Sequence, residues 1–310
     1  MVLVVNLIVI LWGAIVRALG AGAGCGEHWP LCNGSVMPAP HLKTLVEYGH
    51  RLTSGIALFM VVALVVYAWR IFPKGHWVRR SAAWALGFEV SEGLIGAGLV
   101  LLGHVAEDKS TARGYSLALH LINTLLLLAA LAVTAQFATR SYLQWNDAGK
   151  FLRILLGLAA LGIFVIAISG AIVALGDTLF PAANLAEGMR QDFQPTAHPF
   201  VRLRILHPML AIVVGLYTSS LAVYLLSFCN ASSNARRLSI SLVILTMSQL
   251  ALGGLNLIFL APVPIQLVHL LLADLLWITF VFLSIELLTR SDPMVETDAS
   301  NLTTSITCLP

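Results

Sequence analysis

The amino-acid sequence predicts an all-α membrane protein with eight transmembrane helices, arranged as two pseudo-symmetric four-helix bundles. Three observations lead to this fold class. Of the 310 residues, 58% are hydrophobic and only 11% are charged, and the mean hydropathy is +0.88. The sequence contains eight apolar runs, and each is about as long as the roughly 20 residues that a membrane helix needs. The last four runs repeat features of the first four, which indicates an internal duplication.

The eight runs are separated by charged segments or by segments rich in Gly and Pro. Continuous apolar runs favour helices, because the strands of a membrane barrel would alternate between apolar and polar residues. The predicted spans are 2–20, 49–69, 82–103, 115–136, 153–175, 205–228, 238–260 and 266–288. The first run resembles a signal peptide but has no positively charged leader, so we interpret it as a structural helix. We expect the polar tail 291–310 to be disordered and cytoplasmic.

Basic residues indicate the orientation in the membrane. They gather in the breaks after the second, fourth and sixth helices: Arg70, Lys74, Arg79, Arg80, Arg140, Lys150, Arg153, Arg236 and Arg237. Short cytoplasmic loops collect Lys and Arg, so these breaks and both chain ends are predicted to be cytoplasmic. The long loops 21–48 and 176–204 then face outward. The net charge of +3 is small and dispersed, and gives no case for nucleic-acid binding.

The duplication is visible at a nearly constant shift along the chain. At a shift of 157 residues, Gly13-Ala-Ile-Val16 recurs as Gly170-Ala-Ile-Val173, His50 as His207, Ser91 as Ser248 and Gly96 as Gly253. His120 recurs as His269 at a shift of 149, because the preceding outer loop is eight residues shorter in the second half. We therefore predict an N-terminal half, 1–140, and a C-terminal half, 150–290. Because each half has an even number of helices, both halves have the same topology in the membrane. The symmetry axis that relates them should therefore run along the membrane normal.

Four of the nine histidines lie at or near the outer ends of the second, fourth, sixth and eighth predicted helices: His50, His120, His207 and His269. Ionisable side chains within membrane segments are uncommon and usually functional. Two imidazoles from neighbouring helices at one depth can hold a haem iron from both faces. Zinc would need further ligands, which no Cys or acidic pattern supplies in both halves. For any one of these histidines, the alternative is a hydrogen bond between helices.

Small residues near the four histidines are relevant to the predicted haem sites. They are Gly55, Gly96, Gly98, Gly215, Gly253 and Gly254. They leave room for a flat macrocycle, but ordinary close packing of helices accounts for them equally well.

The two halves differ beside the first histidine of each pair. Glu47 precedes His50 by three residues and shares its helix face, and the shift of 157 replaces it by Arg204. An arginine near a haem edge most simply pairs with a propionate. A carboxylate there would repel propionates, which favours a chemical role for Glu47. The alternative is that Glu47 caps the N-terminus of the helix.

A pair of cysteines also distinguishes the halves. Cys25 and Cys32 lie in the first outer loop, on the side of the membrane where disulfides persist, and we predict a disulfide between them. Two free thiols are the alternative. The corresponding loop, 176–203, contains no cysteine, so the pair belongs to the first half only.

The combination of these motifs resembles the haem A synthase family over nearly the whole chain. The residues that carry the resemblance are Gly22-Ala-Gly-Cys-Gly-Glu-His-Trp-Pro-Leu-Cys32, Glu47-Tyr-Gly-His-Arg51 and the three further helix-borne histidines. The resemblance implies oxidation of one methyl group of haem O to a formyl group, with molecular oxygen, to give haem A. It implies that His50 and His120 bind the haem O substrate and that Glu47 matches the catalytic acid. It further implies that His207 and His269 hold a haem b that carries electrons.

Arg51 and Arg204 are then candidate contacts to the haems. The resemblance places the protein in a bacterial inner membrane, with haem O synthase and the cytochrome oxidase assembly machinery as candidate partners and a homo-oligomer left open. Some relatives have a second cysteine pair in the later outer loop, which this chain lacks. Three other functions are alternatives: a di-haem cytochrome b that exchanges electrons with quinone, a duplicated transporter, and a carrier that returns haem O unchanged. A transporter would more often bind its substrate near the membrane midplane.

Overall fold

The computed structural model describes residues 1–310 except 37, 39, 141–142, 146–148, 229–231 and 292–310. Within these residues, seven helices are long and apolar enough to cross a membrane. They are α2 (Leu42–Ile71), α3 (Trp77–Leu101), α4 (Thr111–Thr139), α5 (Lys150–Leu179), α7 (Pro199–Phe228), α8 (Ser233–Ile258) and α9 (Val263–Leu288). Helices suit these runs because lipid offers the backbone no hydrogen-bond partner. The chain is a multi-pass membrane protein.

The first predicted span forms a shorter helix, α1 (Val2–Ala18), of 17 residues. At about 1.5 Å per residue it extends about 25 Å, which is less than the roughly 30 Å of the hydrocarbon core. Seven long apolar helices and one shorter one therefore occupy the regions where eight spans are predicted.

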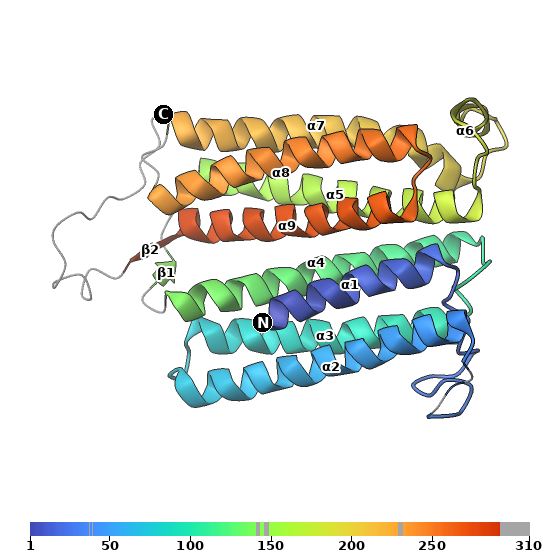
Figure 1. Cartoon of the computed structure of the whole chain (residues 1–310). Coiled ribbons are helices and arrows are strands. Elements are labelled where there is room, and N and C mark those ends of the chain that lie inside the picture. The colour runs from blue at the N-terminus through green and yellow to red at the C-terminus, as the bar shows by residue number, and fades with distance from the viewer. Residues whose placement is uncertain (37, 39, 141–142, 146–148, 229–231, 292–310) are drawn as a thin grey trace.

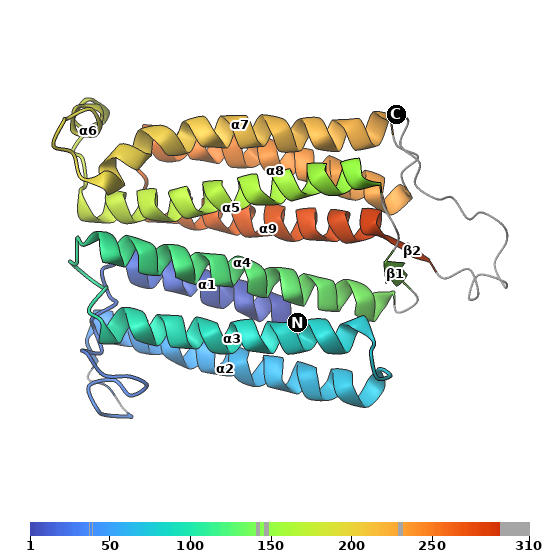
Figure 2. The same cartoon turned by 180° about the vertical axis from the view of Figure 1, so that it is seen from behind.

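Figures 1 and 2 show α1, α2, α3 and α4 on one side of the molecule and α5, α7, α8 and α9 on the other. The two groups meet mainly where α4 lies against α9 and α5. In their most apolar stretches α4 is 50% buried and α9 44%, against 17–28% in the other five long helices. At this boundary Trp277 of α9 donates its indole N–H to the carbonyl of Leu125 of α4, at 2.8 Å. The main core therefore lies between the two helix groups.

Several helices begin earlier than the sequence predicts. α2 begins at Leu42 rather than at residue 49, and α7 at Pro199 rather than at residue 205. An apolar run marks only the part of a helix that suits hydrocarbon, whereas the helix itself continues into polar residues outside it. The short helix α6 (Leu185–Asp192), which the sequence analysis does not predict, lies in the second long outer loop.

The two ends of the molecule differ in what joins the helices. The loop with Cys25 and Cys32 and helix α6 lie at one end, and a small sheet lies at the other (Figure 1). This sheet, also not predicted, pairs β1 (Leu143–Trp145) with β2 (Thr289–Ser291) in antiparallel fashion. Because β1 follows α4 and β2 follows α9, it connects the ends of the two helix groups. The tail predicted to be disordered lies, beyond Ser291, outside the described residues.

Candidate functional site

The four histidines lie at similar depths, each about two turns from the start of its helix. His50 is in α2, His120 in α4, His207 in α7 and His269 in α9. All four helices begin at the end of the molecule that carries the cysteine loop and α6 (Figure 1). His50 interacts electrostatically with His120, and His207 with His269, so each half holds one pair of neighbouring imidazoles.

The first histidine of each pair packs against a glycine that recurs in the duplication. A side chain on Gly13 of α1 would begin 3.1 Å from Cε1 of His50. A side chain on Gly170 of α5 would begin 2.9 Å from Cε1 of His207. Both distances are shorter than an ordinary carbon contact, so a larger residue at either position would displace the imidazole ring that packs against it.

The second histidine of each pair also faces a recurring glycine, but here an added side chain would make only an ordinary contact. A side chain on Gly96 of α3 would begin 3.8 Å from Nε2 of His120, and one on Gly253 of α8 would begin 3.4 Å from Cε1 of His269. The repeat of Gly13, Gly96 and their counterparts therefore marks the helix surfaces that face the imidazole rings. The sequence shows this repeat but not its cause.

The other glycines singled out from the sequence do not face the histidines. Side chains on Gly55, Gly98 or Gly254 would meet no atom of the described residues within 4 Å. A side chain on Gly215 would meet Leu250 at 3.1 Å, which is ordinary helix packing. Of the six glycines considered, only Gly96 and Gly253 approach an imidazole.

These pairs fit a haem iron held between two imidazole nitrogens. Nδ1 of His50 and Nδ1 of His269 are buried, and neither has a hydrogen-bond partner among the described residues. Nδ1 of His207 lies 2.9 Å from the hydroxyl of Ser169. Such a contact fixes the ring and leaves Nε2 for a metal, as outer-shell partners of ligating histidines do.

Glu47 does not cap its helix, which excludes one of the two alternatives drawn from the sequence. The helix begins at Leu42 with His41 as N-cap, and no acidic residue lies in its first turn. The Glu47 side chain is buried and has partners for both oxygens. Oε1 lies 2.6 Å from Nη2 of Arg51, and Oε2 accepts the backbone N–H of Cys25 at 2.8 Å. Glu47 thus anchors the cysteine loop to α2.

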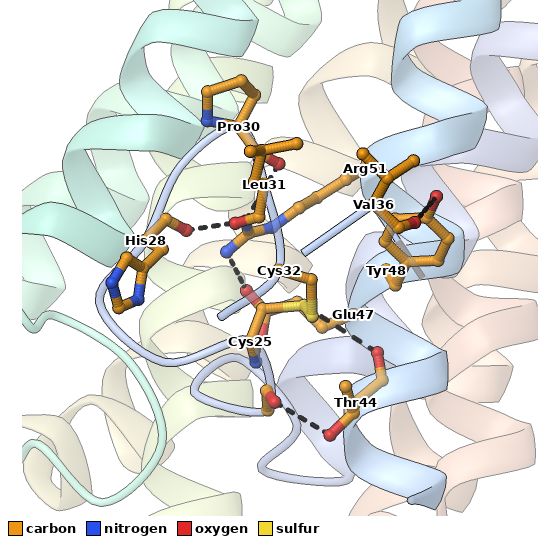
Figure 3. Close-up of a disulfide and its surroundings, with 11 residues drawn as sticks. Cys25, His28, Pro30, Leu31, Cys32, Val36, Thr44, Glu47, Tyr48 and Arg51 are labelled. Atoms are coloured by element: carbon orange, nitrogen blue, oxygen red, sulfur yellow. Dashed lines mark hydrogen bonds and ion pairs between the residues drawn. A yellow bond between two sulfur atoms is a disulfide. The ribbon is translucent and has the colours of Figure 1, made fainter. Parts of the chain in front are cut away.

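The loop above α2 is closed by a disulfide, as predicted from the sequence. Cys25 and Cys32 are bonded and fully buried. Arg51 donates from Nη1 to the carbonyls of His28 at 2.7 Å and Leu31 at 3.0 Å. Figure 3 shows the Arg51 guanidinium reaching from α2 into this loop. The Arg51 side chain therefore joins the disulfide loop, through its carbonyls, to Glu47.

Arg204, the counterpart of Glu47, is also surrounded by protein groups. Its Nη2 donates to the carbonyls of Gly176 at 3.0 Å and Phe180 at 2.6 Å. Its Nε lies 2.7 Å from Asp177, and its Nη1 lies 3.5 Å from Asp192 of α6. Burial raises the pKa of the Asp192 carboxyl above its ordinary value, although Arg204 acts in the opposite direction. Arg204 thus holds α6 against α5 as Arg51 holds the cysteine loop.

Arg17 connects the two helix groups and was not singled out from the sequence. In the last turn of α1, it donates to the carbonyl of Ala174 and to the hydroxyl of Thr178 in α5, and to Oε1 of Gln266 in α9. Ala174 is the residue that the shift of 157 relates to Arg17. A charged residue within a predicted span is the signal that could have identified it.

Polar residues beside the second histidine of each pair were also missed. Nδ1 of His120 lies 3.0 Å from Oε1 of Glu92 in α3. Nε2 of His269 lies 3.2 Å from the side-chain nitrogen of Gln249 in α8, the counterpart of Glu92 at the shift of 157. Glu92 lies within the predicted span 82–103, where a carboxylate is a functional hypothesis by default.

The sequence of this chain matches a known family over most of its length. Residues 1–43 and 39–281 match the family model described as "Cytochrome oxidase assembly protein". The chain belongs to this family. The chain is also similar to proteins that are named "Heme A synthase", and together these two findings confirm the resemblance to the haem A synthase family.

The curated relatives that this chain matches differ in name and in length. In two strains of Thermus thermophilus, a protein named "Protoheme IX farnesyltransferase" is 47% identical over 298 residues, 95% of this chain and 48% of that protein. "Heme A synthase" of Alkalihalophilus pseudofirmus is 40% identical over 98 residues, 31% of this chain and 33% of that protein. "Heme A synthase" of Bacillus cereus is 34% identical over 139 residues, 44% of this chain and 45% of that protein. The chain spans about half the length of the Thermus relatives. The matched part is a smaller share of the two proteins named "Heme A synthase".

Proposed function

We propose that this chain is a haem A synthase, a membrane oxidoreductase that converts a methyl group of haem O to a formyl group. One observation carries the proposal: two pairs of histidines at one depth, each ring packed on a glycine that recurs in the duplication. Membership of the cytochrome oxidase assembly family agrees with it. So do the shorter matches to relatives named "Heme A synthase".

The two helix groups correspond, in this proposal, to two pseudo-symmetric four-helix bundles with different tasks. Residues 1–140 bind the substrate haem O between His50 and His120. Residues 150–290 bind haem b between His207 and His269. This assignment is supported by the position of Glu47 and of the disulfide loop, which both belong to the first half.

Haem b in the second half would supply one-electron transfer. The first half would supply the groups that orient the substrate and move protons. Oxidation of a methyl group removes protons and electrons from its carbon, so a carboxylate beside the carbon can accept and return a proton. Glu47 is the proposed group. For this role it must release Arg51 or the N–H of Cys25, which bind its two oxygens in the structure.

Arg51 and Arg204 are proposed to lie at the haem edges and to contact propionates. Arginine suits this contact because its planar fork binds carboxylates through two N–H groups. Both side chains bind loop carbonyls of the protein. Either arginine would therefore place a propionate next to the outer loop that it holds, the cysteine loop for Arg51 and α6 for Arg204.

The proposed location is a bacterial inner membrane, with both chain ends cytoplasmic and the cysteine loop outside. Molecular oxygen is the proposed oxidant. The name of the Thermus relatives describes farnesyl transfer to protohaem IX, and those proteins are about twice as long as the part that resembles this chain. Farnesylated protohaem is the class of molecule that this chain would consume. We therefore propose a protohaem farnesyltransferase as a partner, beside cytochrome oxidase assembly factors and a second copy of this chain.

Analysis of extracted haem tests the proposal. Membranes that contain a haem O source are prepared with and without this chain, and the haems are separated and identified by mass and absorption spectrum. We expect a formylated haem only with the chain and oxygen. Unchanged haem O together with a low-spin spectrum that responds to quinol would favour the di-haem cytochrome. Unchanged haem O that is bound and released without electron exchange would favour a carrier.

A further inference from the structure

The second histidines of the two halves have different partners, although their helices correspond. In α3, Oε1 of Glu92 lies 3.0 Å from Nδ1 of His120, and about a fifth of the Glu92 side chain is exposed. The ring N–H is not aligned for a regular hydrogen bond. Contacts of this kind often tighten only when the site is filled. The nitrogen that faces the carboxylate is Nδ1, which leaves Nε2 on the other side of the ring.

The Glu92 carboxylate is held by two residues that follow His120 in α4. Thr124 donates its hydroxyl to Oε1, and Asn123 donates its amide N–H to Oε2. Ser91 donates to Oδ1 of Asn123 at 2.6 Å, which fixes the orientation of the amide. The carboxylate therefore has a fixed position from which it can orient the His120 ring.

The second half keeps a serine, Ser248, in place of Ser91 but lacks the carboxylate and both residues that hold it. The shift of 157 replaces Glu92 by Gln249, and the shift of 149 replaces Asn123 and Thr124 by Leu272 and Ala273. The Gln249 amide lies at Nε2 of His269 rather than at Nδ1. The anion and both groups that hold it are thus specific to the first half, which argues against general helix packing as their purpose.

We propose that Glu92 is a positioning residue for His120: it holds the Nδ1–H tautomer, presents Nε2 to the substrate haem iron and strengthens the imidazole as a donor. This inference rests on the proposed function, in which His120 binds haem O. Ligating histidines usually donate their second ring N–H to an outer partner, and a carboxylate partner raises ligand basicity most. A stronger donor favours ferric over ferrous iron, so Glu92 lowers the reduction potential at the first site.

The experiment uses the full chain in lipid nanodiscs, with ferric protohaem as the probe. A His269→Ala background leaves one complete histidine pair, His50 and His120. Affinity is measured by titration, and the reduction potential by spectroscopic potentiometry. In Glu92→Gln we expect the affinity for ferric protohaem to fall about 10–100-fold. We expect the affinity for ferrous protohaem to fall less. Each tenfold decrease in the ratio of the ferric affinity to the ferrous affinity raises the reduction potential by about 59 mV. Glu92→Asp should recover part of both effects.

Glu89→Gln is the matched control, because Glu89 is a buried carboxylate one turn earlier in α3, and the carboxylate at His120 is that of Glu92. We expect it to leave the potential unchanged. The inference is overturned if Glu92→Gln has the affinity and potential of the parent, or if Glu89→Gln shifts the potential equally. If the parent binds no protohaem between His50 and His120, the proposed function of the first site fails instead.

A second variant is measured if Glu92→Gln does not fold. Folding is judged in the chain with His269 intact, where the His207–His269 site reports on the whole molecule. If that site is lost, Thr124→Ala is measured, because it removes one group that holds the carboxylate and copies Ala273. A rise in potential in Thr124→Ala, smaller than about 59 mV, supports the inference. No change in Thr124→Ala overturns it.

Discussion

The two helix groups share their histidines and the glycines that face them but differ in the charged groups beside them. In the first group, Glu47 and a disulfide loop lie beside His50, and Glu92 lies beside His120. In the second group, Arg204 and the helix α6 occupy the place of Glu47 and the loop.

Two pairs of corresponding residues illustrate this difference. Arg51 corresponds to Pro208, which has no N–H to donate within α7, and Glu92 corresponds to Gln249. In the proposed function, the shared residues hold the two haems, and the differing residues set the charges and proton-accepting groups around each haem. Ligand identity alone therefore does not assign a role to either half, and variants in one half should leave the other unaffected.

Loss of a histidine gives the largest expected effect. His207→Ala or His269→Ala should abolish the low-spin haem spectrum of the second half, because a single imidazole cannot hold the iron from both faces. His50→Ala or His120→Ala should spare that spectrum and stop the conversion of haem O. Absorption and electron paramagnetic resonance spectra of the purified protein measure the first effect, and haem extraction measures the second. Equal spectral effects of all four variants would refute distinct roles for the halves.

Glu47→Gln should have the next largest effect, a loss of haem O oxidation of about 10²–10⁴-fold. The substitution keeps the shape and one hydrogen-bond acceptor but removes the proton-accepting group. We expect haem binding to persist, the alcohol to accumulate, and Glu47→Asp to retain part of the activity. The measurement is the ratio of haem O, its alcohol and haem A in extracts.

Glu187→Gln is the control for Glu47, because Glu187 is a carboxylate of the other outer loop that binds Ala183 and Gln191. It should keep normal conversion. If Glu47→Gln lost activity only together with the order of the cysteine loop, measured by protease cleavage, Glu47 would be an anchor and not a proton acceptor.

Reduction of Cys25–Cys32 should have a smaller effect that is confined to the first half. A bond across a loop this short contributes roughly 2–3 kcal/mol to local order. After reduction we expect faster proteolysis of the loop and weaker substrate binding, with the spectrum of the second half unchanged. Thiol labelling with and without reductant checks the bond itself. Full labelling of both cysteines before reduction would contradict it.

Gly170→Ala should give the smallest of these effects. Its methyl group would begin 2.9 Å from His207, so the ring must shift. Overpacking of this kind costs about 1 kcal/mol or more, which corresponds to an affinity for haem at the second site about fivefold weaker. Titration of the purified chain measures this. Gly55→Ala, which would meet nothing within 4 Å, is the control and should bind haem normally. Equal affinities in the two variants would show that the glycine does not shape the site.

The helices and the histidines could be predicted from the sequence, whereas most contacts of the histidines could not. The apolar runs locate α2 to α5 and α7 to α9 to within a few residues, but α2 begins seven residues before its predicted start. That difference excludes Glu47 as a cap, because a residue in the second turn cannot cap the helix. The repeated Gly13 and Gly96 were visible as a pattern, and only the structure shows that each faces a histidine.

The sequence by itself determined the membrane fold, the duplication and the four histidines. These features depend on the composition of continuous segments and on a constant shift along the chain, and both can be read without any folded structure. The tertiary structure decided which side chains meet: Glu47 with Cys25, Glu92 with His120, and Arg17 with Gln266. These contacts join different helices and loops, and the angle at which two helices pack sets which of their residues touch. Sequence spacing within a single helix carries no information about that angle.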